Sequence, residues 1–220
     1  PVRAVVTAAH TWSLGGLDAD VAALPLLPDG PGFAPTADVP RPDGVPAGNW
    51  RRMSRVARIA AACAAPALAR ALDRDGLALF FGTGIGEFSS TVGFLRTLYG
   101  KGPAGASPLL FQNAVHNAAA GHLSIAFGLK GPSETLCAGP LTSARTLERA
   151  LSWVALHGRP ALVVVADDLG PDVQQGYVFA GAVATMGEGG AALLLEPDGD
   201  GVPVTWHDAP ARPGDWRRAG

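Results

Sequence analysis

The fold is decided by residues 107–143, which read SPLLFQNAVHNAAAGHLSIAFGLKGPSETLCAGPLTS. Apolar residues recur at helical spacing over 112–127, and the run Ala-Ala-Ala-Gly inside it allows a neighbouring element to approach the backbone closely. Residues 133–138 predict a strand. Pro140 then opens a second helix at 141–156, because proline suits the first helical position, where its missing N–H would be unpaired. The stretch therefore predicts a helix, a strand and a second helix in succession.

The flanking segments continue this alternation. Apolar residues at helical spacing predict helices at 52–72 and at 87–99. Short apolar runs predict strands at 2–9, 77–81, 159–168, 190–196 and 202–206, and between the first of these and the helix at 52 lie a short helical turn near 19–24 and a Pro/Gly-rich insertion at about 25–50. Strands that alternate with helices indicate an α/β domain, with a mixed, largely parallel sheet covered by helices.

Composition indicates one compact domain over residues 1–220, because 48% of the 220 residues are hydrophobic and 16% are charged. The net charge of −2 provides no broad attraction for nucleic acid. No uncharged apolar run approaches the roughly 20 residues that cross a bilayer. The two cysteines are too few for a disulfide framework and lack the clustering typical of zinc sites. We therefore expect a cytoplasmic protein that binds no nucleic acid and contains no membrane span, metal or cofactor.

Three motifs resemble those of one enzyme family. Residues 117–132 are similar to the pattern NMxAGHxSIxxGLxGP of the β-ketoacyl synthases of the thiolase superfamily, a pattern that runs into a strand ending T-A-C-x-S-G. RRMSRVARIAAACAAPALA at 51–69 resembles the synthase segment R-x-x-D-R-x-x-R-x-A-x-x-A-A, and GTGIGEF at 82–88 resembles the turn G-S-G-I-G-G or G-T-G-I-G-G. The resemblance, over roughly 51–196, implies the thiolase-like fold of the N-terminal half of a ketosynthase.

Pro140 occupies the position of the family's nucleophile. Counting along SETLCAGP from the matched Gly-Pro places Pro140 where the synthases have the cysteine that takes the acyl chain. Proline has no side-chain nucleophile, so acyl transfer by the family route is excluded at this position. The two catalytic histidines of the synthases belong to a second half that we do not find in this sequence. The resemblance thus implies a chain that is not an independent condensing enzyme.

The motif N-x-V-H-N-A-A-A-G at 113–121 narrows the resemblance. It resembles the short chain-length-factor-like subunits of aryl-polyene synthases, within type II polyketide or fatty-acid-like biosynthesis. This implies a non-catalytic subunit that forms a heterodimer with a complete β-ketoacyl synthase. The pair would share the channel for an acyl chain held on the phosphopantetheine of an acyl carrier protein. The residues implied at the channel or the interface are Ile85, Leu110, Asn113, His116 and Asn117.

The helix after Pro140 is predicted to be amphipathic. Its apolar stripe comprises Leu141, Ala144, Leu147, Leu151 and Val154. Its polar face comprises Thr142, Arg145, Glu148, Arg149 and Ser152. The resemblance implies that in a two-half synthase this helix is packed on both sides, so a charged face indicates solvent or a polar partner surface.

The sequence leaves two other functions open. An acyltransferase or thiolase-like enzyme would use Cys137 as its nucleophile, with His116 as a base or donor. Against it, a cysteine inside a strand is more often a small buried hydrophobe, and we expect Cys63 to be a core residue of its helix. For His116 itself we favour structural hydrogen bonding. The other open function, a homodimeric acyl-binding scaffold, would need no synthase partner.

The remaining polar motifs favour structural roles. The glycines at 82–86 follow a strand, but their spacing differs from G-x-G-x-x-G, so we reject a dinucleotide site. Asp167 and Asp168 would suit a metal or acid/base pair, although a strand-to-loop cap is the better interpretation. We expect His122 to be a satisfied core residue. No G-x-S-x-G motif indicates a hydrolase, and no metal-site spacing with carboxylates is found for His10, His157 and His207.

Overall fold

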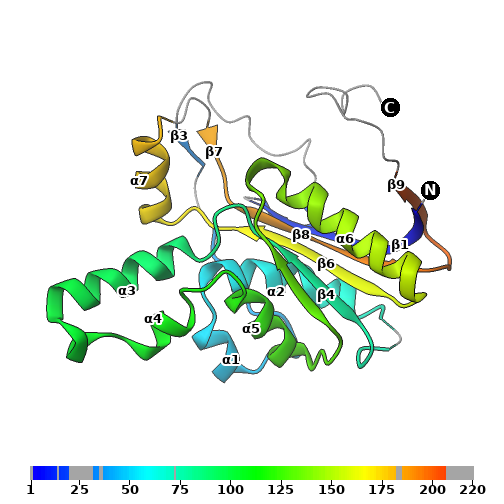
Figure 1. Ribbon diagram of the computed structural model, residues 1–220, viewed down its shortest axis with the longest axis horizontal. Helices are drawn as coiled ribbons and strands as arrows, with labels where there is room; N and C mark the ends of the chain where they lie inside the picture. Colours follow the sequence, from blue (N-terminus) through cyan, green and yellow to red (C-terminus); the bar gives the residue numbers. More distant parts are fainter. Residues whose placement is uncertain are drawn as a thin grey trace.

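The structure, a computed structural model, describes residues 2–13, 15–19, 32–34, 37–71, 73–181 and 185–206. Within these ranges one sheet has the strand order β2-β1-β8-β6-β4-β5, and β9 also pairs with β1 (Figure 1). Its strands are β1 (Val2–Ser13), β2 (Gly16–Leu17), β4 (Ala78–Gly82), β5 (Ser133–Leu136), β6 (Ala161–Asp167), β8 (Gly189–Glu196) and β9 (Val202–Trp206). A separate parallel pair is formed by β3 (Gly32–Phe33) and β7 (Thr185–Met186).

Helices connect these strands and cover the sheet. They are α1 (Ala47–Arg52), α2 (Arg55–Leu68), α3 (Phe88–Lys101), α4 (Pro108–Gln112), α5 (Ala118–Phe127), α6 (Thr142–His157) and α7 (Pro171–Phe179). Two short 3₁₀ turns, η2 (Pro103–Gly105) and η3 (Gly139–Leu141), precede α4 and α6. Among the described residues, no helix is long and apolar enough to cross a membrane.

The sheet is mixed, as expected, but the expectation that it is largely parallel was wrong. β4 pairs in parallel with β5 and β6, whereas β6 and β1 pair antiparallel with β8, and β1 pairs antiparallel with β2 and β9. The nine residues of α7 extend about 13 Å, whereas the seven of β6 extend about 23 Å. α7 lies beyond the strand ends and does not run back along the sheet (Figure 1). β8 therefore begins at the end of the sheet where β6 finishes, and it runs antiparallel to β6.

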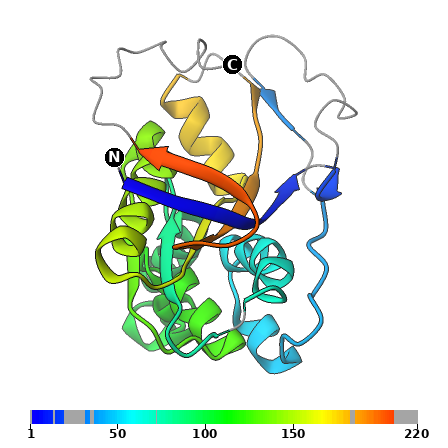
Figure 2. The same ribbon diagram turned by 90° about the vertical axis from the view of Figure 1, so that its right-hand side faces the viewer.

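Helices lie on both faces of the sheet, with α2 on one and α6 on the other (Figure 2), and α5 packs in the same core as α2. Side chains of β4 alternate between the two cores, because successive residues of a strand point to opposite faces. Leu79 and Phe81 pack with α2 and α5, while Ala78 and Phe80 pack against α6. The sequence alternation of strands and helices therefore produces a three-layered core, as an α/β domain requires.

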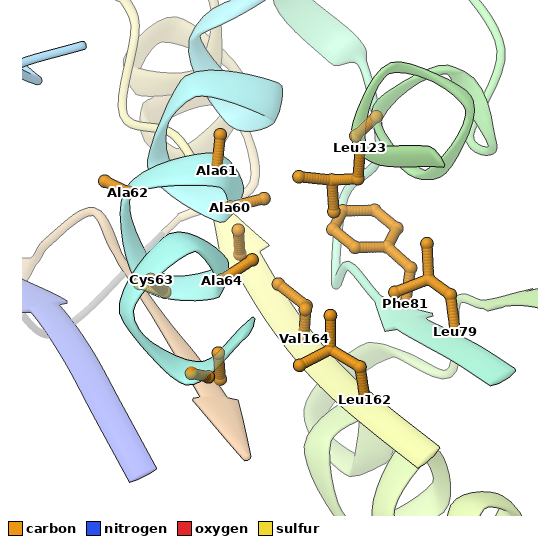
Figure 3. Packing of buried hydrophobic residues seen from close by; sticks show 14 of the residues in the cluster. Ala60, Ala61, Ala62, Cys63, Ala64, Leu79, Phe81, Leu123, Leu162 and Val164 are labelled. Atoms are coloured by element: carbon orange, nitrogen blue, oxygen red, sulfur yellow. The ribbon is translucent and has the colours of Figure 1, made fainter. Parts of the chain in front are cut away.

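The core between α2 and the sheet uses small side chains. A run of alanines at 60–64, interrupted by Cys63, packs against Leu162 and Val164 of β6, with Phe81 and Leu123 beside them (Figure 3). Gly190 of β8 permits the close approach of α2, because a Cβ there would lie 2.9 Å from a methyl carbon of Ile59. Cys63 is fully buried, which confirms the expectation for this residue.

α6 is amphipathic, but its buried stripe differs from the predicted one. Leu151 and Val154 are buried as expected, whereas Leu141 is 57% exposed and Ala144 is exposed. Thr142 and Thr146 are buried in their place, because their hydroxyls have partners: Thr142 Oγ1 donates to the Gly139 carbonyl at 2.8 Å and Thr146 Oγ1 to the Thr142 carbonyl at 2.7 Å. The prediction considered apolar residues only and so missed these hydrogen-bonded threonines. The predicted stripe was therefore rotated around the helix relative to the buried face.

Two predicted helices are each broken by a capping residue. The helix expected at 52–72 is divided at Ser54, whose Oγ accepts a hydrogen bond from the Ala57 nitrogen at 3.1 Å and thereby begins α2. α1 begins at Ala47, so the last residues of the insertion expected at 25–50 are helical. The helix expected at 112–127 begins only after Asn117, because Asn113 ends α4 and uses its side chain for other contacts. The turn expected near 19–24, apart from Ala19, and His207 lie outside the described residues.

Candidate functional site

The glycine-rich turn at 82–86 joins β4 to α3 and is held by Asp167. The Gly84 nitrogen donates to both carboxylate oxygens of Asp167, at 2.8 and 3.0 Å, and the Ile85 nitrogen donates to Oδ1 at 3.2 Å. The Thr83 hydroxyl donates to the same oxygen at 2.6 Å. Asp167 therefore caps the turn, as the favoured interpretation of this residue predicts. The backbone amides that a dinucleotide phosphate would need are already bound to this carboxylate, which supports the rejection of such a site.

Pro140 lies in η3, between β5 and α6, and is exposed. The connection is held by Thr142, whose hydroxyl accepts a hydrogen bond from the Ala138 nitrogen at 2.9 Å and donates to the Gly139 carbonyl. The local geometry therefore does not depend on a hydrogen bond from residue 140. At the start of α6 the chain presents a saturated ring, which can neither attack a thioester nor exchange a proton.

Cys137 does not have the environment that we expected. β5 ends at Leu136, because β4, its only neighbour in the described sheet, ends at the paired residue Gly82. Cys137 therefore lies just beyond the strand and is exposed instead of buried. Its Sγ donates to the Gly84 carbonyl at 3.4 Å, so the thiol lies against the turn that Asp167 holds.

Ile85 lines a small cavity between this turn and α7. The cavity has a volume of about 220 Å³, and its walls are almost entirely apolar: Ile85, Phe88, Val173, Gly176, Tyr177 and Ala180. Gly176 of α7 faces the Phe88 ring, since a Cβ there would lie 3.6 Å from it, in ordinary van der Waals contact. The cavity is smaller than a typical ligand pocket, and its lining suits one aliphatic or aryl group of a longer chain.

His116 and Leu110 occupy different places. The His116 side chain packs on the glycine turn, since a Cβ at Gly86 would lie 2.8–2.9 Å from atoms of its ring. Leu110 lies farther out, against α3, where a Cβ at Gly93 would be 3.7 Å from its methyl carbons. The structure therefore brings Ile85, His116 and Cys137 to one turn, and it leaves Leu110 between α3 and α4.

Asn113 connects elements that pack together, and Asn117 lies at a helix start. Asn113 is buried, its Nδ2 donates to the Arg52 carbonyl at 2.9 Å, and its Oδ1 lies 2.8 Å from His122 Nε2. His122 is 7% exposed, and burial, followed by the charge of Arg52, lowers its pKa. This confirms His122 as a satisfied core residue. Asn117 is exposed at the N-terminus of α5.

A cluster of buried acids beside the turn was missed by sequence reasoning. Glu87 is 3% exposed, and its carboxylate accepts hydrogen bonds from the hydroxyls of Ser54, at 2.6 Å, and Ser90, at 3.1 Å. Burial raises the pKa of Glu87 to about 7; the two serines offset part of the rise, and the charge of Asp168 adds to it. The signal available in the sequence was Glu87 itself, where the G-T-G-I-G-G pattern ends in glycine.

Two further acids complete the cluster. Asp168 is 4% exposed; its Oδ2 accepts a hydrogen bond from the Ser89 hydroxyl at 3.1 Å, and within the described residues its Oδ1 has no partner. Burial raises the pKa of Asp168 as well. Glu188, at the start of β8, is paired with Arg55, whose Nε donates to it at 2.7 Å. The Arg55 charge is therefore already engaged by Glu188.

α3 and α4 form an arm that projects from the sheet (Figure 1). Neither helix contains a buried residue. Large apolar side chains on the arm and just beyond it are exposed, by 38% to 84% of their surface: Leu95, Tyr99, Leu109, Phe111 and Val115. Such a gathering of exposed apolar side chains is typical of a surface that another protein covers.

Of the remaining histidines, His10 and His157 lie in the described ranges, and the ring of each contacts another side chain. His10 Nδ1 lies 2.6 Å from Asp18 Oδ2, a pairing that the sequence spacing did not suggest, because the β1–β2 hairpin folds Asp18 back onto β1. His157 stacks on Trp153, with ring centroids 3.9 Å apart. Across the described ranges, no group of three or more His, Cys, Asp or Glu side chains is arranged to hold a metal ion.

Comparisons with known proteins identify the family. The family model described as "Beta-ketoacyl synthase, N-terminal domain" matches residues 29–213. No curated protein sequence matches the chain. Among solved structures, the chain is similar to one of the ketosynthase ApeO in complex with its chain length factor ApeC from Xenorhabdus doucetiae, at 23% identity and a TM-score of 0.67, covering 91% of this chain and 81% of that one.

Two more solved structures show the same likeness. The ishigamide ketosynthase/chain length factor is 21% identical, with a TM-score of 0.67 and coverage of 89% of this chain and 62% of that chain. The AntDE:AntF complex, described as a type II PKS acyl-carrier protein with its ketosynthase bound to the hexaketide, is 16% identical, with a TM-score of 0.71 and coverage of 88% and 62%. The fold is thus the thiolase-like fold of ketosynthases, and the chain spans about three fifths of the length of these two relatives.

Proposed function

Because this chain belongs to the β-ketoacyl synthase N-terminal domain family, we propose that it is a non-catalytic, chain-length-factor-like subunit that pairs with a complete β-ketoacyl synthase. The observation that carries the proposal is Pro140. It is exposed in η3, just before α6, at the position where the synthase pattern has its nucleophilic cysteine. A condensing reaction with this chain therefore needs a thiolate from a partner.

Two surfaces support a partner of similar fold. Apolar side chains of the arm, such as Tyr99 and Phe111, are exposed in the single chain, so another protein can cover them without disturbing the core. β5 is the last strand on its side of the described sheet, with β4 as its only neighbour there. A strand with one open edge can accept hydrogen bonds from a strand of a second subunit. The solved complex of a ketosynthase with its chain length factor is a precedent for such a pair.

The apolar cavity beside Ile85 supports a role in shaping an acyl channel. Among the described residues, its lining contains no charged side chain, and Tyr177 alone contributes a polar side-chain atom. Such walls favour the hydrocarbon or aryl part of an acyl chain over its polar end. We infer that the substrate chain is carried by an acyl carrier protein, in aryl-polyene or type II polyketide biosynthesis, and that Ile85 forms part of the wall that the chain meets.

Co-expression tests both parts of the proposal. The chain is co-purified with a complete β-ketoacyl synthase and an acyl carrier protein encoded beside it, and product length is measured by mass spectrometry. Ile85→Trp should leave the complex intact and shorten the products, because the indole fills the cavity. Ile125→Trp is the matched control, since Ile125 is 69% exposed on α5. The absence of a complex would refute the pairing, and unchanged product length with Ile85→Trp would refute the channel role.

A second candidate function is favoured by one observation, the exposure of Cys137 beside the turn that also contacts His116. In this alternative the chain is an acyltransferase or thiolase-like enzyme, and Cys137 receives the acyl group. The isolated chain would then form an acyl-enzyme on incubation with an acyl thioester, detected by intact mass, and Cys137→Ser would abolish it. Our proposal expects no acyl adduct at Cys137 in the presence of the synthase partner, which should carry the acyl group itself.

A further inference from the structure

Glu87 connects the start of α2 to the start of α3. The Ser54 hydroxyl donates to Glu87 Oε1 at 2.6 Å, and the same oxygen of Ser54 accepts the Ala57 N–H that begins α2. Ser90, in the first turn of α3, donates to the other carboxylate oxygen. Glu87 is also the residue directly before α3 and follows the turn that contains Ile85. One buried carboxylate therefore joins two helices whose starts are 33 residues apart.

The two residues in this contact both depart from the synthase patterns. The segment R-x-x-D-R has aspartate at the position of Ser54, and the turn G-T-G-I-G-G has glycine at the position of Glu87. The patterns thus place one carboxylate at the first position and none at the second. This chain has the reverse arrangement, and its serine and glutamate are in direct contact.

We propose that Glu87 is a positioning residue, which supplies from the Ile85 turn the carboxylate that the synthase pattern supplies from position 54. Its hydrogen bonds to Ser54 and Ser90 fix the turn and the α3–α4 arm on the start of α2. The two differences from the synthase patterns, serine for aspartate at position 54 and glutamate for glycine at position 87, then compensate each other: one carboxylate is lost and one is gained at the same contact.

The charges around Glu87 make the two arrangements mutually exclusive. Asp168, the residue after β6, is buried, and its charge adds to the rise in the pKa of Glu87. Glu188, just before β8, acts in turn on Asp168, and Asp167 holds the preceding turn. Arg55 of α2 is bound to Glu188, and His116 packs on Gly86. A second carboxylate at position 54, where Ser54 now contacts Glu87, would place two like charges together beside Asp168, and like charges in a buried site destabilise the fold.

A double-mutant cycle on the isolated chain tests the exchange, with Ser54→Asp, Glu87→Gly and both together. Aspartate begins helices as well as serine does, so Ser54→Asp should cost nothing unless it meets Glu87. We expect Ser54→Asp alone to lower the folding equilibrium constant at least tenfold at pH 8, and Glu87→Gly alone to lower it similarly. The double variant should recover at least tenfold relative to Ser54→Asp, measured by urea unfolding. Additive effects would overturn the proposal.

A local measurement separates positioning from a general loss of stability. Hydrogen exchange followed by mass spectrometry should show that Glu87→Gly speeds exchange in 83–101 more than in β8, and that the double variant restores the slow exchange. If Glu87→Gly does not fold, Glu87→Gln replaces it, because glutamine has the same shape without the charge: its oxygen accepts from one serine hydroxyl and its NH2 group donates to the other. Ser54→Asp should then be tolerated in the Glu87→Gln background. Equal damage from Ser54→Asp in both backgrounds would refute the proposal.

Discussion

The carboxylate of Asp167 lies 2.8 Å from the backbone nitrogen of Gly84, which is 83 residues earlier in the chain. The two residues meet because β4 and β6 are parallel neighbours whose carboxyl ends lie side by side, with Gly82 paired to Val165. An internal anion thereby occupies the amides of a glycine-rich turn, where a phosphate binds in other α/β proteins. The direction of Ile85 toward α7 thus depends on a residue of the adjacent strand.

Removal of this anion should destabilise the protein. Asp167→Ala leaves the N–H groups of Gly84 and Ile85 without their acceptor. We expect it to lower the free energy of unfolding by about 2–4 kcal/mol, and Asp167→Asn by less, because asparagine retains one acceptor oxygen. Urea unfolding measures the difference. The control is Asp172→Asn, which breaks a pair with Arg96 whose arginine is 62% exposed; it should cost under about 1 kcal/mol. Equal costs for Asp167→Ala and Asp172→Asn would contradict the clamp.

Gly82 has no room for a side chain next to Thr146. A Cβ there would lie 2.3 Å from Thr146 Oγ1, so Gly82→Ala should lower the free energy of unfolding by about 2 kcal/mol. Thr146→Ala removes the obstructing hydroxyl. The double variant should therefore be at least about 1 kcal/mol more stable than the sum of the single effects. Thermal or urea unfolding of the four proteins provides this comparison, and strict additivity would show that the contact is relieved in another way.

Glu87 should make stability depend on pH. Burial raises the pKa of Glu87 from 4.5 to about 7, so between these values the folded protein retains a proton that the unfolded chain releases. The free energy of unfolding should therefore fall as pH rises from about 4.5 to about 7, by up to about 3 kcal/mol, and stay level above. Glu87→Gln should remove this fall, so that the variant exceeds the natural chain in stability at pH 8. Parallel pH profiles of the two proteins would contradict this assignment.

The two cysteines should react very differently. Cys137 is exposed, whereas Cys63 is fully buried and burial raises the pKa of its thiol to about 12. In the folded chain, iodoacetamide should add one label, at Cys137, and the second only after unfolding in urea. Peptide mass spectrometry locates the labels. A rate at Cys137 far above that of an unfolded-chain cysteine at the same pH would instead favour the acyltransferase alternative.

The arm should mediate association without contributing to the stability of the single chain. Tyr99 and Phe111 are 84% and 62% exposed, so Tyr99→Glu and Phe111→Glu should change the free energy of unfolding by less than about 0.5 kcal/mol. Each should weaken the complex with a synthase partner at least tenfold, measured by titration with the partner or by co-purification. Leu156→Glu is the matched control, because Leu156 is 79% exposed on α6. Equal weakening by Leu156→Glu would place the interface elsewhere.

Local patterns in the sequence predicted most elements, and they failed where side chains make distant contacts. The apolar runs at 77–81, 159–168 and 190–196 correspond to β4, β6 and β8, because buried strands need continuous apolar residues. Helix starts were misplaced because Ser54 caps the start of α2, and because Asn113 ends α4 so that α5 begins only after Asn117. The burial of Thr142 and Thr146 was missed, because their hydroxyls are satisfied within the α6 region itself.

The sequence by itself determined that residue 140 cannot act as the acyl-accepting nucleophile, because proline has no nucleophilic side chain in any conformation. It also determined the α/β alternation, which follows from local periodicity. Only the tertiary structure decided the antiparallel half of the sheet, the exposure of Cys137 and the contacts of Glu87 and Asp167. These depend on which strand ends become neighbours after folding, and that arrangement results from packing among residues far apart in the chain.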